Sequence, residues 1–479
     1  MTRINTNIPA ITAQTHLARS TRDMNQTLQR LSSGLRITRG ADDPAGLIAS
    51  ESLRAEMASI SQAIDNSQRA SNVIATAEGA LAEVAALMIN IKELTVEAAN
   101  AGALSAEEIR ANQLQVDSAI DSITRIANAT TFAGLHLLNG NLGYITSGVS
   151  TTDVKALDIY SALLGDQSYM AVKVSGVLSA QRGELQFRTS QVNQSVTLEV
   201  ATNRGVEVFS FVSGFRISSM VSAINAVTNA IGVSATFISA THPQSGIIFR
   251  SIDYGSDAFV SVRALPSSSG TFTTVDSSGV TRLRDEGRDV VATVNGATSV
   301  GTGQEITLNT GSLDLLMRLD AGFGAGDSTT FSIIGGGAMF QLGPHINTTE
   351  QTSIGVNSIA ASRLGSVENG FLNEVSTGGA YSLISGQTGR AARIIEEAIR
   401  QIAVMRGRLG AFERNTLDTN MNSLRITLEN VTASESAIRD ADFAVETAAL
   451  TRSQILVHAG TSVLALANQT PQSVLSLLQ

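Results

Sequence analysis

Apolar residues in the first third of the chain recur at alternating steps of four and three positions. The series runs from Leu53 to Leu81 and continues from Val84 to Ala98, with polar residues at Ser67, Ser71 and Glu78. Repeats of this kind form the seam of a helical coiled coil, along which one helix packs against a partner. The pattern therefore predicts a long helix whose seam is apolar apart from a few polar layers.

Capping residues mark the end of this helix and the start of the next. The sequence Ala-Asn-Ala-Gly at residues 99–102 is typical of a helix stop, and Ser105 precedes two acidic residues, Glu107 and Glu108. A serine N-cap followed by carboxylates suits the first turn of a helix, because the helix dipole favours negative charge there. The sequence therefore predicts a second helix, whose apolar positions run from Val116 to Ala127.

The C-terminal third carries the same heptad pattern with a phase slip. Apolar residues follow steps of three and four from Ile395 to Phe412, slip by one position before Leu417, and then continue to Val431. A slip of this kind locally changes the winding of a coiled coil. We therefore expect a long helical segment whose geometry is perturbed between residues 412 and 417.

Both extreme ends of the chain are also apolar. The apolar positions there are Met24, Leu28, Leu31, Leu35, Phe443, Leu450, Leu456, Val457, Val463 and Leu464. Chain termini are usually frayed and polar, and one chain offers too few neighbours to cover these seams. Burying a single leucine is worth roughly 1.5–3 kcal/mol, so a monomer that exposed a dozen such groups would self-associate. The two ends therefore predict an assembly interface.

Between residues 146 and 336 the period changes to that of strands. Residues 196–200, 206–211 and 258–262 alternate between apolar and polar, whereas residues 217–230 have the spacing of a short helix. A second strand-rich run covers residues 290–334. This order predicts an α+β insert with half-buried strands. Residues 340–342 and 354–356 are expected to form a hairpin that returns the chain to its helical part.

Composition excludes several classes of protein. The chain has 479 residues, which suggests about three domains, and it has no cysteine and no tryptophan. Zinc sites built on cysteine, iron–sulfur clusters, disulfides and cysteine nucleophiles are therefore excluded. Lys plus Arg number 33 against 42 Asp plus Glu, a net charge of −9, which argues against nucleic acid as a partner. We identify no signal peptide and no membrane-spanning segment, and we expect no membrane insertion.

No motif in the sequence indicates catalysis. The glycine clusters at 322–326 and 335–337 lack the lysine of a phosphate-binding loop, and the five histidines are scattered without a metal-binding spacing. The adjacent carboxylates Asp42 and Asp43 precede Pro44, which favours a helix N-cap over metal or acid–base chemistry. We therefore predict no catalytic residue, no cofactor and no metal, and a protein that is not an enzyme.

Both ends resemble one known family. The segment from Thr27 to Ile37, followed by Ala-Asp-Asp-Pro-Ala-Gly at residues 41–46, is similar to the N-terminal signature of bacterial flagellin. The tail agrees, with Ala-Leu-Ala-Asn-Gln at 465–469 and Ser-Val-Leu-Ser-Leu-Leu at 473–478. The resemblance covers about 60% of the chain and is specific, because two signatures occur at the correct opposite ends. Gln479 stands where the family commonly has arginine.

This resemblance implies a fold and an arrangement of domains. The expected fold is an α+β multidomain protein, with a long antiparallel helical coiled-coil core built from both chain ends and a β-rich outer part inserted in the middle. The expected segments are an inner-core helix at 1–42, the first half of the outer-core coiled coil at 43–145, and a surface insert of one or two subdomains at 146–336. A hairpin and the second coiled-coil half follow at 337–432, and a second inner-core helix follows at 433–479.

The resemblance also implies a function and site residues. The chain is expected to be a secreted, extracellular subunit of the flagellar filament, which serves swimming motility and polymerises through its terminal helices after export as an unfolded chain. The expected assembly interface is Leu28, Leu31, Leu35, Phe443, Leu450, Leu456, Val457, Val463, Leu464, Leu475 and Leu478. The expected motif that joins the helices is Ser33, Gly34, Arg36, Asp42, Asp43, Pro44 and Gly46. Implied partners are other copies of the chain, an export chaperone, the type III export apparatus, and the filament cap and hook-junction proteins.

Alternative functions remain open at this point. A hook–filament junction protein has similar ends, although the motif from Gln469 to Leu478 favours a filament subunit. A flagellin with a protease in its middle is disfavoured, because residues 146–336 hold a single histidine, His242. An adhesin-like surface flagellin is a third possibility.

A last implication concerns an innate immune receptor. Flagellins of the enteric type are sensed by Toll-like receptor 5 through a helix face that matches residues 91–94 of this chain, together with the next helix. In those flagellins the position of Asn90 is arginine and that of Gln115 is glutamate, whereas Leu94 is retained. A charged hot spot is worth 2 kcal/mol or more, roughly a thirtyfold change in affinity. We therefore predict weak recognition by this receptor.

Overall fold

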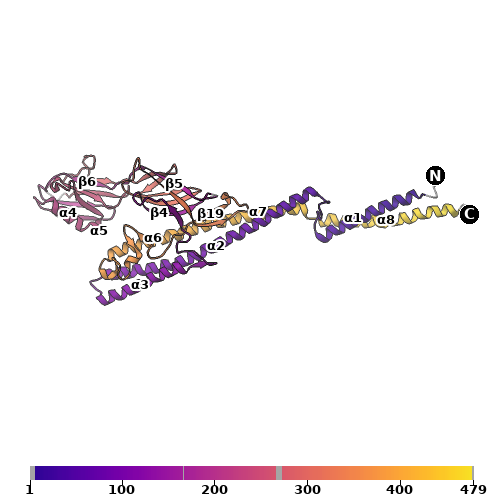
Figure 1. The fold of residues 1–479 in the computed structure, drawn as a ribbon, viewed down its shortest axis with the longest axis horizontal. Coiled ribbons are helices and arrows are strands. Elements are labelled where there is room, and N and C mark those ends of the chain that lie inside the picture. The colour runs from indigo at the N-terminus through magenta and orange to yellow at the C-terminus, as the bar shows by residue number, and fades with distance from the viewer. Residues whose placement is uncertain (1–5, 166, 266–271, 477–479) are drawn as a thin grey trace. The chain divides into compact units, whose positions relative to one another are not determined.

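The computed structural model describes residues 6–165, 167–265 and 272–476, and the chain divides into two compact units (Figure 1). The terminal unit comprises residues 1–71, 341–346 and 413–479. The central unit comprises residues 72–340 and 347–412. Helix α2 (Pro44–Ala99) begins in the terminal unit and ends in the central unit.

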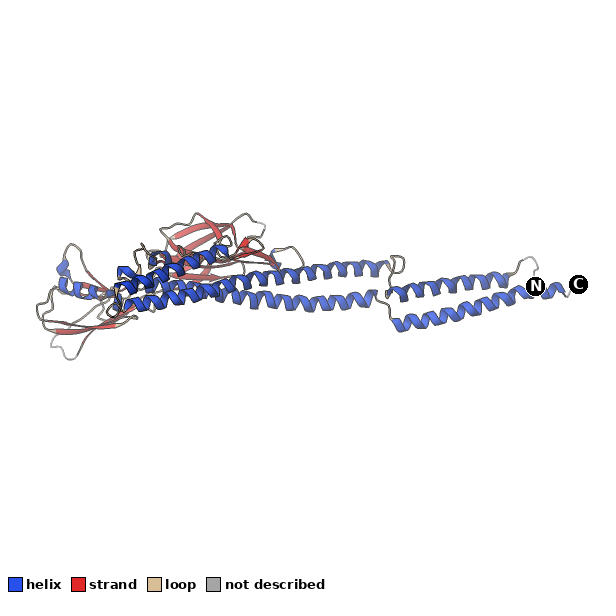
Figure 2. Ribbon diagram, turned by 90° about the horizontal axis from the view of Figure 1, so that it is seen from below, coloured by secondary structure: helices blue, strands red, loops and turns tan. Residues whose placement is uncertain are grey.

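The terminal unit is built from antiparallel helix pairs. Helix α1 (Ile8–Ser33) packs along α8 (Phe443–Ser476), so that the first and last helices of the chain lie side by side (Figure 2). The first half of α2 packs against α7 (Thr419–Arg439), where Ile60 and Ala63 meet Leu424 in a small apolar cluster. The expected pairing of the two chain ends as helices is confirmed.

A π-helical segment, η5 (Glu413–Asp418), precedes α7. It occupies the place where the apolar series slips by one position between Phe412 and Leu417. A π-helix has more residues per turn than an α-helix, so the extra residue is absorbed and Leu417 is still fully buried. The perturbation that the sequence predicted is therefore a π segment.

The helices of the central unit are the second half of α2, α3 (Ala106–Ala129) and α6 (Thr388–Phe412). Helix α2 ends at Ala99, as predicted, and α3 begins with a capping box in which Glu108 N–H donates to Ser105 Oγ at 3.2 Å. In return the Ser105 N–H donates to the Glu108 carboxylate at 2.6 Å, and this bond lowers the pKa of Glu108 below its usual value. The start of α3 is thus fixed by local chemistry visible in the sequence.

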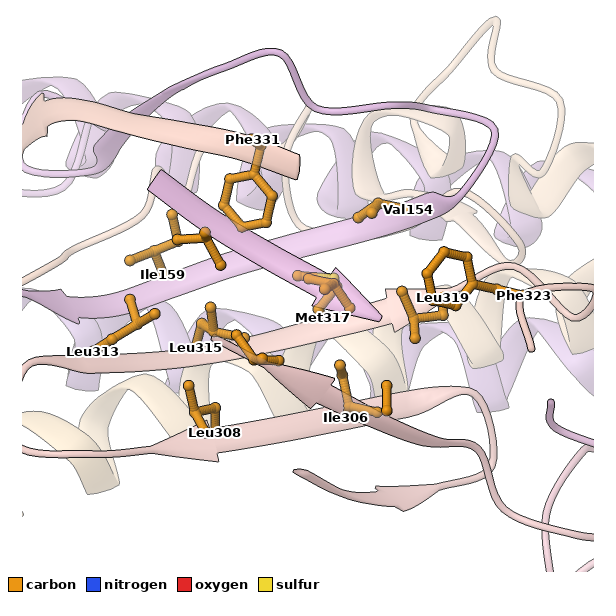
Figure 3. Close-up of a cluster of buried hydrophobic side chains, with 14 of the residues drawn as sticks. Val154, Ile159, Ile306, Leu308, Leu313, Leu315, Met317, Leu319, Phe323 and Phe331 are labelled. Atoms are coloured by element: carbon orange, nitrogen blue, oxygen red, sulfur yellow. The ribbon is translucent and has the colours of Figure 1, made fainter. Parts of the chain in front are cut away.

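The insert contains two separate β structures. The larger is an antiparallel eight-stranded sheet in the order β3-β17-β5-β13-β14-β15-β16-β4. Its strands are β3 (Tyr144–Ser147), β4 (Val154–Ala162), β5 (Met170–Leu178), β13 (Val291–Val294), β14 (Ala297–Thr302), β15 (Glu305–Asn309), β16 (Leu313–Leu319) and β17 (Ser328–Gly336). One face carries a core that includes Ile159, Leu315, Met317 and Phe331 (Figure 3).

The smaller β structure has two sheets and a helix around one core. A four-stranded sheet, β12-β11-β7-β8, and a three-stranded sheet, β6-β10-β9, enclose a cluster that includes Leu198, Met220 and Phe249. The strands are β6 (Glu184–Phe187), β7 (Val196–Ala201), β8 (Val206–Phe211), β9 (Val233–Phe237), β10 (Ile247–Ser251), β11 (Phe259–Ala264) and β12 (Arg284–Glu286). The single helix predicted over residues 217–230 is interrupted at Val227, which leaves α4 (Ile217–Ala226) and the short α5 (Thr228–Ile231).

Short elements complete the central unit. Three two-stranded sheets pair β1 (Thr131–Phe132) with β2 (Leu135–His136), β18 (Ala338–Gln341) with β19 (Gln351–Ile354), and β20 (Gly365–Ser366) with β21 (Gly370–Phe371). The 3₁₀ turns are η1 (Pro243–Ser245), η2 (Thr348–Glu350), η3 (Leu372–Val375) and η4 (Leu383–Ser385). The pair of β18 and β19 lies within three residues of the hairpin that the sequence predicted.

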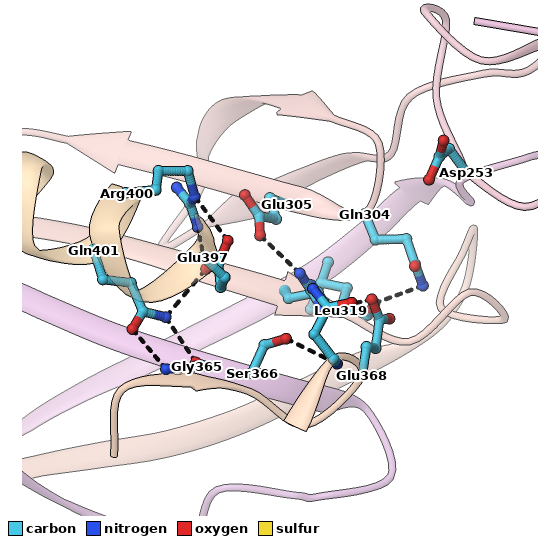
Figure 4. A network of polar contacts seen from close by, with 12 residues as sticks. Asp253, Gln304, Glu305, Leu319, Gly365, Ser366, Glu368, Glu397, Arg400 and Gln401 are labelled. Carbon is cyan, nitrogen blue, oxygen red and sulfur yellow. Dashed lines mark hydrogen bonds and ion pairs between the residues drawn. The ribbon is translucent and has the colours of Figure 1, made fainter. Parts of the chain in front are cut away.

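Polar side chains of α6 face the eight-stranded sheet and the loops beside it. Gln401 holds both the N–H and the carbonyl oxygen of Gly365, at 3.0 and 2.7 Å (Figure 4). Arg408 pairs with Asp314 at 2.7 Å and its guanidinium lies 3.3 Å from the centre of the Tyr160 ring. The opposite face of α6 buries Ile395, Ala398 and Ile402. Helix α6 is therefore apolar on one side and polar on the side that carries the insert.

One helix has the length and composition of a membrane span. The sequence analysis identified none, but α2 contains a window that is apolar enough to cross a bilayer, and a third of that window, 33%, is buried. The core helix of a soluble protein passes the same test. Fully buried residues of α2, such as Leu81, Val84, Met88 and Ile91, follow the heptad spacing of a helix that packs on its neighbours.

Candidate assembly surface and helix connectors

Two connectors join the helices of the terminal unit, one between α1 and α2 and one between α7 and α8. Helix α1 ends at Ser33 and is capped by Gly34, whose φ of +70° places it in the left-handed region that glycine adopts at helix C-caps. The Gly34 carbonyl oxygen accepts a hydrogen bond from the N–H of Ala441, at 2.9 Å. Ser33 supports the turn, since its hydroxyl accepts from the N–H of Leu35 at 3.3 Å.

The two connectors are hydrogen-bonded to each other where they cross. Leu35 and Asp440 form an antiparallel bridge, and the N–H of Arg36 donates to the carbonyl oxygen of Arg439 at 2.7 Å. The Arg36 guanidinium donates to the carbonyl oxygen of Ile438 at 2.5 Å. The break between α1 and α2 and the break between α7 and α8 therefore lie side by side. Helix α7 continues through the expected boundary at 432 and ends only at Arg439.

The two carboxylates before α2 have different roles. Asp43 is the N-cap, because its Oδ1 accepts from the N–H of Gly46 at 2.9 Å and Pro44 is the first helical residue. The expectation that Asp42 shares this role is wrong. Asp42 Oδ2 instead accepts from the hydroxyl and N–H of Thr38, at 2.9 and 3.1 Å, and from the N–H of Arg39. These bonds hold the pKa of Asp42 below its usual value.

Gly46 is needed where the connector packs onto the first turn of α2. A Cβ at this position would lie 2.7 Å from Cδ1 of Ile37 and 2.5 Å from Oδ2 of Asp43. Ile37 is 1% exposed and is the one fully buried large side chain of the connector at residues 34–43. The motif thus encodes a turn whose backbone is bound by Asp42 and which packs around Ile37. Asp43 caps the helix that follows.

The seam between α1 and α8 is made largely of small and polar residues. Ala13, Thr27, Glu446, Ser453 and Ala467 are buried along it, and Gly460 lies against Leu17. Arg30 pairs with Glu446 at 3.3 Å, and the Asn7 amide donates to the carbonyl oxygen of Ala467 at 2.8 Å. Larger apolar residues are only half-buried in this seam, namely Leu31, Leu35, Leu450, Val457 and Leu464.

The outward faces of the same two helices are apolar. Of the residues proposed from the sequence, Leu28, Phe443, Leu456 and Val463 are 43%, 70%, 49% and 55% exposed. Leu28 was expected to share a seam with Leu31, but the neighbouring Thr27 takes the buried position. Further large side chains are exposed on these helices and were missed by the sequence analysis: Ile8, Ile11, Val445, Ile455 and Leu466. Leu475 is described only as backbone of α8, and Leu478 lies outside the described residues.

Polar layers cross the pair of α2 and α7 where the sequence interrupts its seam. The Asn420 amide donates to Ser67 Oγ at 3.3 Å and to the carbonyl oxygen of Leu342 at 2.8 Å. Ser71 donates to the Glu413 carboxylate at the start of the π segment. A third layer pairs Ser50 with Glu435 at 2.9 Å. Ser67 is fully buried, so the lapses at Ser67 and Ser71 are hydrogen-bonding positions that favour one register of the helix pair.

The residues expected to form a receptor surface do not all lie on the surface. Asn90 on α2 and Gln115 on α3 are exposed, but Leu94 is only 8% exposed. An apolar anchor that is buried within the subunit is not available to a partner. Near these positions the exposed apolar residues are instead Ile89 and Val96 on α2 and Leu114 on α3.

Nothing in the described parts of the chain assembles a metal centre. Among residues 6–165, 167–265 and 272–476, no group of three or more His, Asp or Glu side chains is placed to hold an ion. The feature that the geometry presents is an apolar surface on α1 and α8.

Family comparisons match both ends of the chain. The bacterial flagellin N-terminal helical region matches residues 4–142, and the bacterial flagellin C-terminal helical region matches residues 392–478. The chain is 28% identical to Flagellin A of Vibrio anguillarum over 491 residues, and 29% identical to Flagellin A of Helicobacter pylori over 525 residues. Each alignment covers 99% of both chains.

Solved structures of flagellar proteins are also similar. Flagellar hook associated protein-3 from Legionella pneumophila gives a TM-score of 0.31 at 12% identity, covering 81% of this chain and 98% of that one. The D1-D2-D3 domains of the Escherichia coli flagellar cap protein give a TM-score of 0.30 at 18% identity, covering 46% of this chain and 64% of that one.

Proposed function

The chain belongs to the bacterial flagellin family and is a structural subunit of the flagellar filament, and we propose that it polymerises through the outward faces of α1 and α8. The observation that carries the proposal is the position of the apolar residues on these helices. Their shared seam is small and polar, while Ile11, Phe443, Ile455, Val463 and Leu466 are more than half exposed. A soluble subunit keeps such a surface because another copy covers it.

The five-part division of the chain belongs to the same proposal. The segments 1–42 and 433–479 form the inner core, the segments 43–145 and 337–432 form the outer-core coiled coil, and 146–336 is the surface insert. The connectors around Arg36 and Arg439 support a division near residues 34–43, because the helices α1 and α2 and the helices α7 and α8 are both separated there. The side of α6 that faces the insert is polar, which supports the view that the helical core is stable without the insert.

We further propose export of the subunit as an unfolded chain, with an export chaperone and the type III export apparatus as transient partners. The small, polar seam of α1 and α8 supports this, since few large apolar groups are buried between the two helices of one subunit. The filament cap and the hook-junction proteins are proposed to contact the same helices at the two ends of the filament. Secretion to the extracellular space follows from these steps.

The alternative functions have less support. Relatives named as flagellins align with the full chain, which favours a filament subunit over a hook–filament junction protein. An adhesin-like role for the insert would add to the filament function and does not replace it. We expect no enzymatic activity.

Recognition by Toll-like receptor 5 is proposed to be weak. Asn90 and Gln115 lack the charges that the receptor surface of enteric flagellins carries, and Leu94 is buried in this subunit. A reporter-cell assay that compares the wild type with the double variant Asn90→Arg and Gln115→Glu tests this. Potent signalling by the wild type, unchanged in the double variant, would contradict the proposal.

A charge on the outward face of α8 tests the assembly surface. Val463 is 55% exposed in the subunit, so Val463→Asp leaves the folded monomer intact but places an unpaired carboxylate in the buried interface of the filament. We expect sedimentation and electron microscopy to show no filaments. Val367→Asp is the matched control, because Val367 is 77% exposed in the loop between β20 and β21. Normal filaments from Val463→Asp would show that this face is not the interface.

A further inference from the structure

Two arginines lie in the first two turns of helix α6. Arg390 and Arg393 are three positions apart, so they are neighbours on the helix surface, and the first turn of α6 has no acidic residue. This is the reverse of the usual arrangement, because the positive end of the helix dipole favours carboxylates over cations. The positive end of α6 therefore carries two additional positive charges.

A third positive charge, that of Arg204, comes from the turn between β7 and β8. Arg393 is half-buried, and its burial, followed by the charges of Arg390 and Arg204, lowers the pKa of its guanidinium below the usual value. A lowered pKa of an arginine means that its surroundings disfavour the positive charge. The three guanidinium groups therefore lie close enough together to repel one another.

Two of these guanidinium groups are held in place by their neighbours. Arg204 Nε donates to Asp253 Oδ2 at 2.7 Å, and Arg204 Nη2 donates to the other carboxylate oxygen. Arg390 Nη2 donates to the carbonyl oxygen of Glu368 at 3.1 Å, and its guanidinium lies 5.4 Å from the centre of the Tyr381 ring. An anion that binds here would meet cations that are already positioned, which lowers the entropy cost of binding.

The third guanidinium, that of Arg393, has no acidic partner. Among the residues that the structure describes, its side chain makes no hydrogen bond and no ion pair. The nearby carboxylates are engaged elsewhere, because Glu396 pairs with Lys92 at 3.1 Å and Glu368 pairs with Arg318 at 3.1 Å. A half-buried cation that is unpaired and lies beside two others lowers stability unless an anion joins it.

We propose that Arg204, Arg390 and Arg393 bind an oxyanion, namely a phosphate or sulfate group. A guanidinium presents paired N–H groups that match two oxygens of such a group, and the positive end of the α6 dipole adds to the attraction. The bound group supplies the negative charge that the three arginines lack. The proposal is independent of the filament function, because all three residues belong to the central unit of one subunit.

Titration calorimetry of the full-length monomer with inorganic phosphate, in chloride buffer of matched ionic strength, tests the site. We expect the wild type to bind one phosphate, and Arg393→Gln to bind it about tenfold more weakly or worse, because hydrogen bonds to a charged group are lost. Arg125→Gln removes one exposed positive charge from α3 and is the matched control, which should bind like the wild type. Glucose 6-phosphate as a second titrant distinguishes a phosphate ester, which would bind at least as tightly, from the free ion.

Urea unfolding of the same monomers separates a binding role of Arg393 from a structural one. Without phosphate, Arg393→Gln relieves the repulsion and should raise the urea midpoint above that of the wild type. Phosphate should raise the midpoint of the wild type and of Arg125→Gln, because it binds only the folded chain, and should leave that of Arg393→Gln unchanged. A lower midpoint of Arg393→Gln, with or without phosphate, would show a structural role. No phosphate binding by the wild type, or equal binding by Arg393→Gln, would overturn the proposal.

Discussion

The N–H of Arg36 donates a hydrogen bond to the carbonyl oxygen of Arg439 across 2.7 Å, and these two residues are 403 positions apart in the sequence. This bond, the bridge between Leu35 and Asp440 and the bond from Ala441 to Gly34 join the two connectors. The helix breaks of the first and last parts of the chain are thereby held at one level. The connectors therefore form an ordered part of the fold, and substitutions of single connector residues test what each contributes to stability.

Gly46→Ala is expected to weaken the connector. The added Cβ would meet Ile37 at 2.7 Å, and Ile37 is buried, so the connector must shift to accept it. Overpacking of this kind typically costs about 1–3 kcal/mol. We expect Gly46→Ala filaments to depolymerise at a lower temperature than wild-type filaments. Gly79→Ala, in the open middle of α2, is the control and should not lower that temperature. Equal depolymerisation of the two variants would contradict the packing argument.

Asp42 should make the connector sensitive to acid. Hydrogen bonds from Thr38 and from the Arg39 N–H lower its pKa in the folded chain, so the carboxylate stabilises the fold above its unfolded pKa of about 3.9. That contribution is lost as the pH falls through the lower, folded pKa. Asp42→Asn should therefore lower the depolymerisation temperature at neutral pH, and the difference from wild type should vanish in strong acid. A difference that is independent of pH would refute this role of the charge.

Ionisation of Asp158 on β4 is expected to destabilise the folded chain. Burial, with Glu305 nearby, raises its pKa, while the Asn357 amide donates to its Oδ1 at 2.8 Å. A raised pKa in the folded chain means that ionisation favours the unfolded chain, so stability falls as the pH rises through the unfolded and folded values. Asp158→Asn keeps an oxygen for Asn357 and should raise the urea midpoint of the monomer at neutral pH. Near pH 3 the gain should disappear. A lower midpoint at neutral pH would show that the charge is stabilising.

The insert should be dispensable for polymerisation. Ser147 and Ser332 are paired neighbours in β3 and β17, so residues 148–331 can be replaced by Asn-Gly to leave a short hairpin. The side of α6 that this deletion uncovers carries Glu397, Arg400, Gln401 and Arg408, which water can solvate. We expect thinner filaments by electron microscopy. A folded deletion variant that stays monomeric would show that the insert contributes to assembly.

Leu464→Asp tests the seam between α1 and α8. Leu464 is half-buried against α1, so the new carboxylate disturbs the helix pair itself as well as any filament built on it. Polymerisation should be lost. Normal filaments would show that the helix register of the terminal unit differs from the one described.

The parts of the fold that follow from local chemistry could be predicted. Ser105 is the N-cap that the sequence indicates, and the slip between Phe412 and Leu417 is a π segment. Ser67 and Ser71 interrupt the seam because each makes a hydrogen bond across the helix pair. In each case a few neighbouring residues determine the outcome, so the sequence pattern is sufficient.

The parts that depend on distant packing could not be predicted. A hydrophobic pattern places Leu28 in the seam, but α1 and α8 pack through Thr27 and other small residues, which bring the helices close and leave the leucine outside. Asp42 and Asp43 are equivalent in sequence, and only the loop that closes around Asp42 separates their roles. The burial of Leu94 likewise depends on the surrounding helices, which a single heptad does not specify.

The central claim is that α1 and α8 are assembly helices whose outward faces are covered only in the filament. Hydrogen exchange of backbone amides in residues 443–469, compared between a monomer verified by sedimentation and the filament, tests it most directly. The account predicts fast exchange in the monomer, where the helix pair has few large buried groups, and exchange slower by orders of magnitude in the filament. Equal protection of these amides in monomer and filament would contradict it.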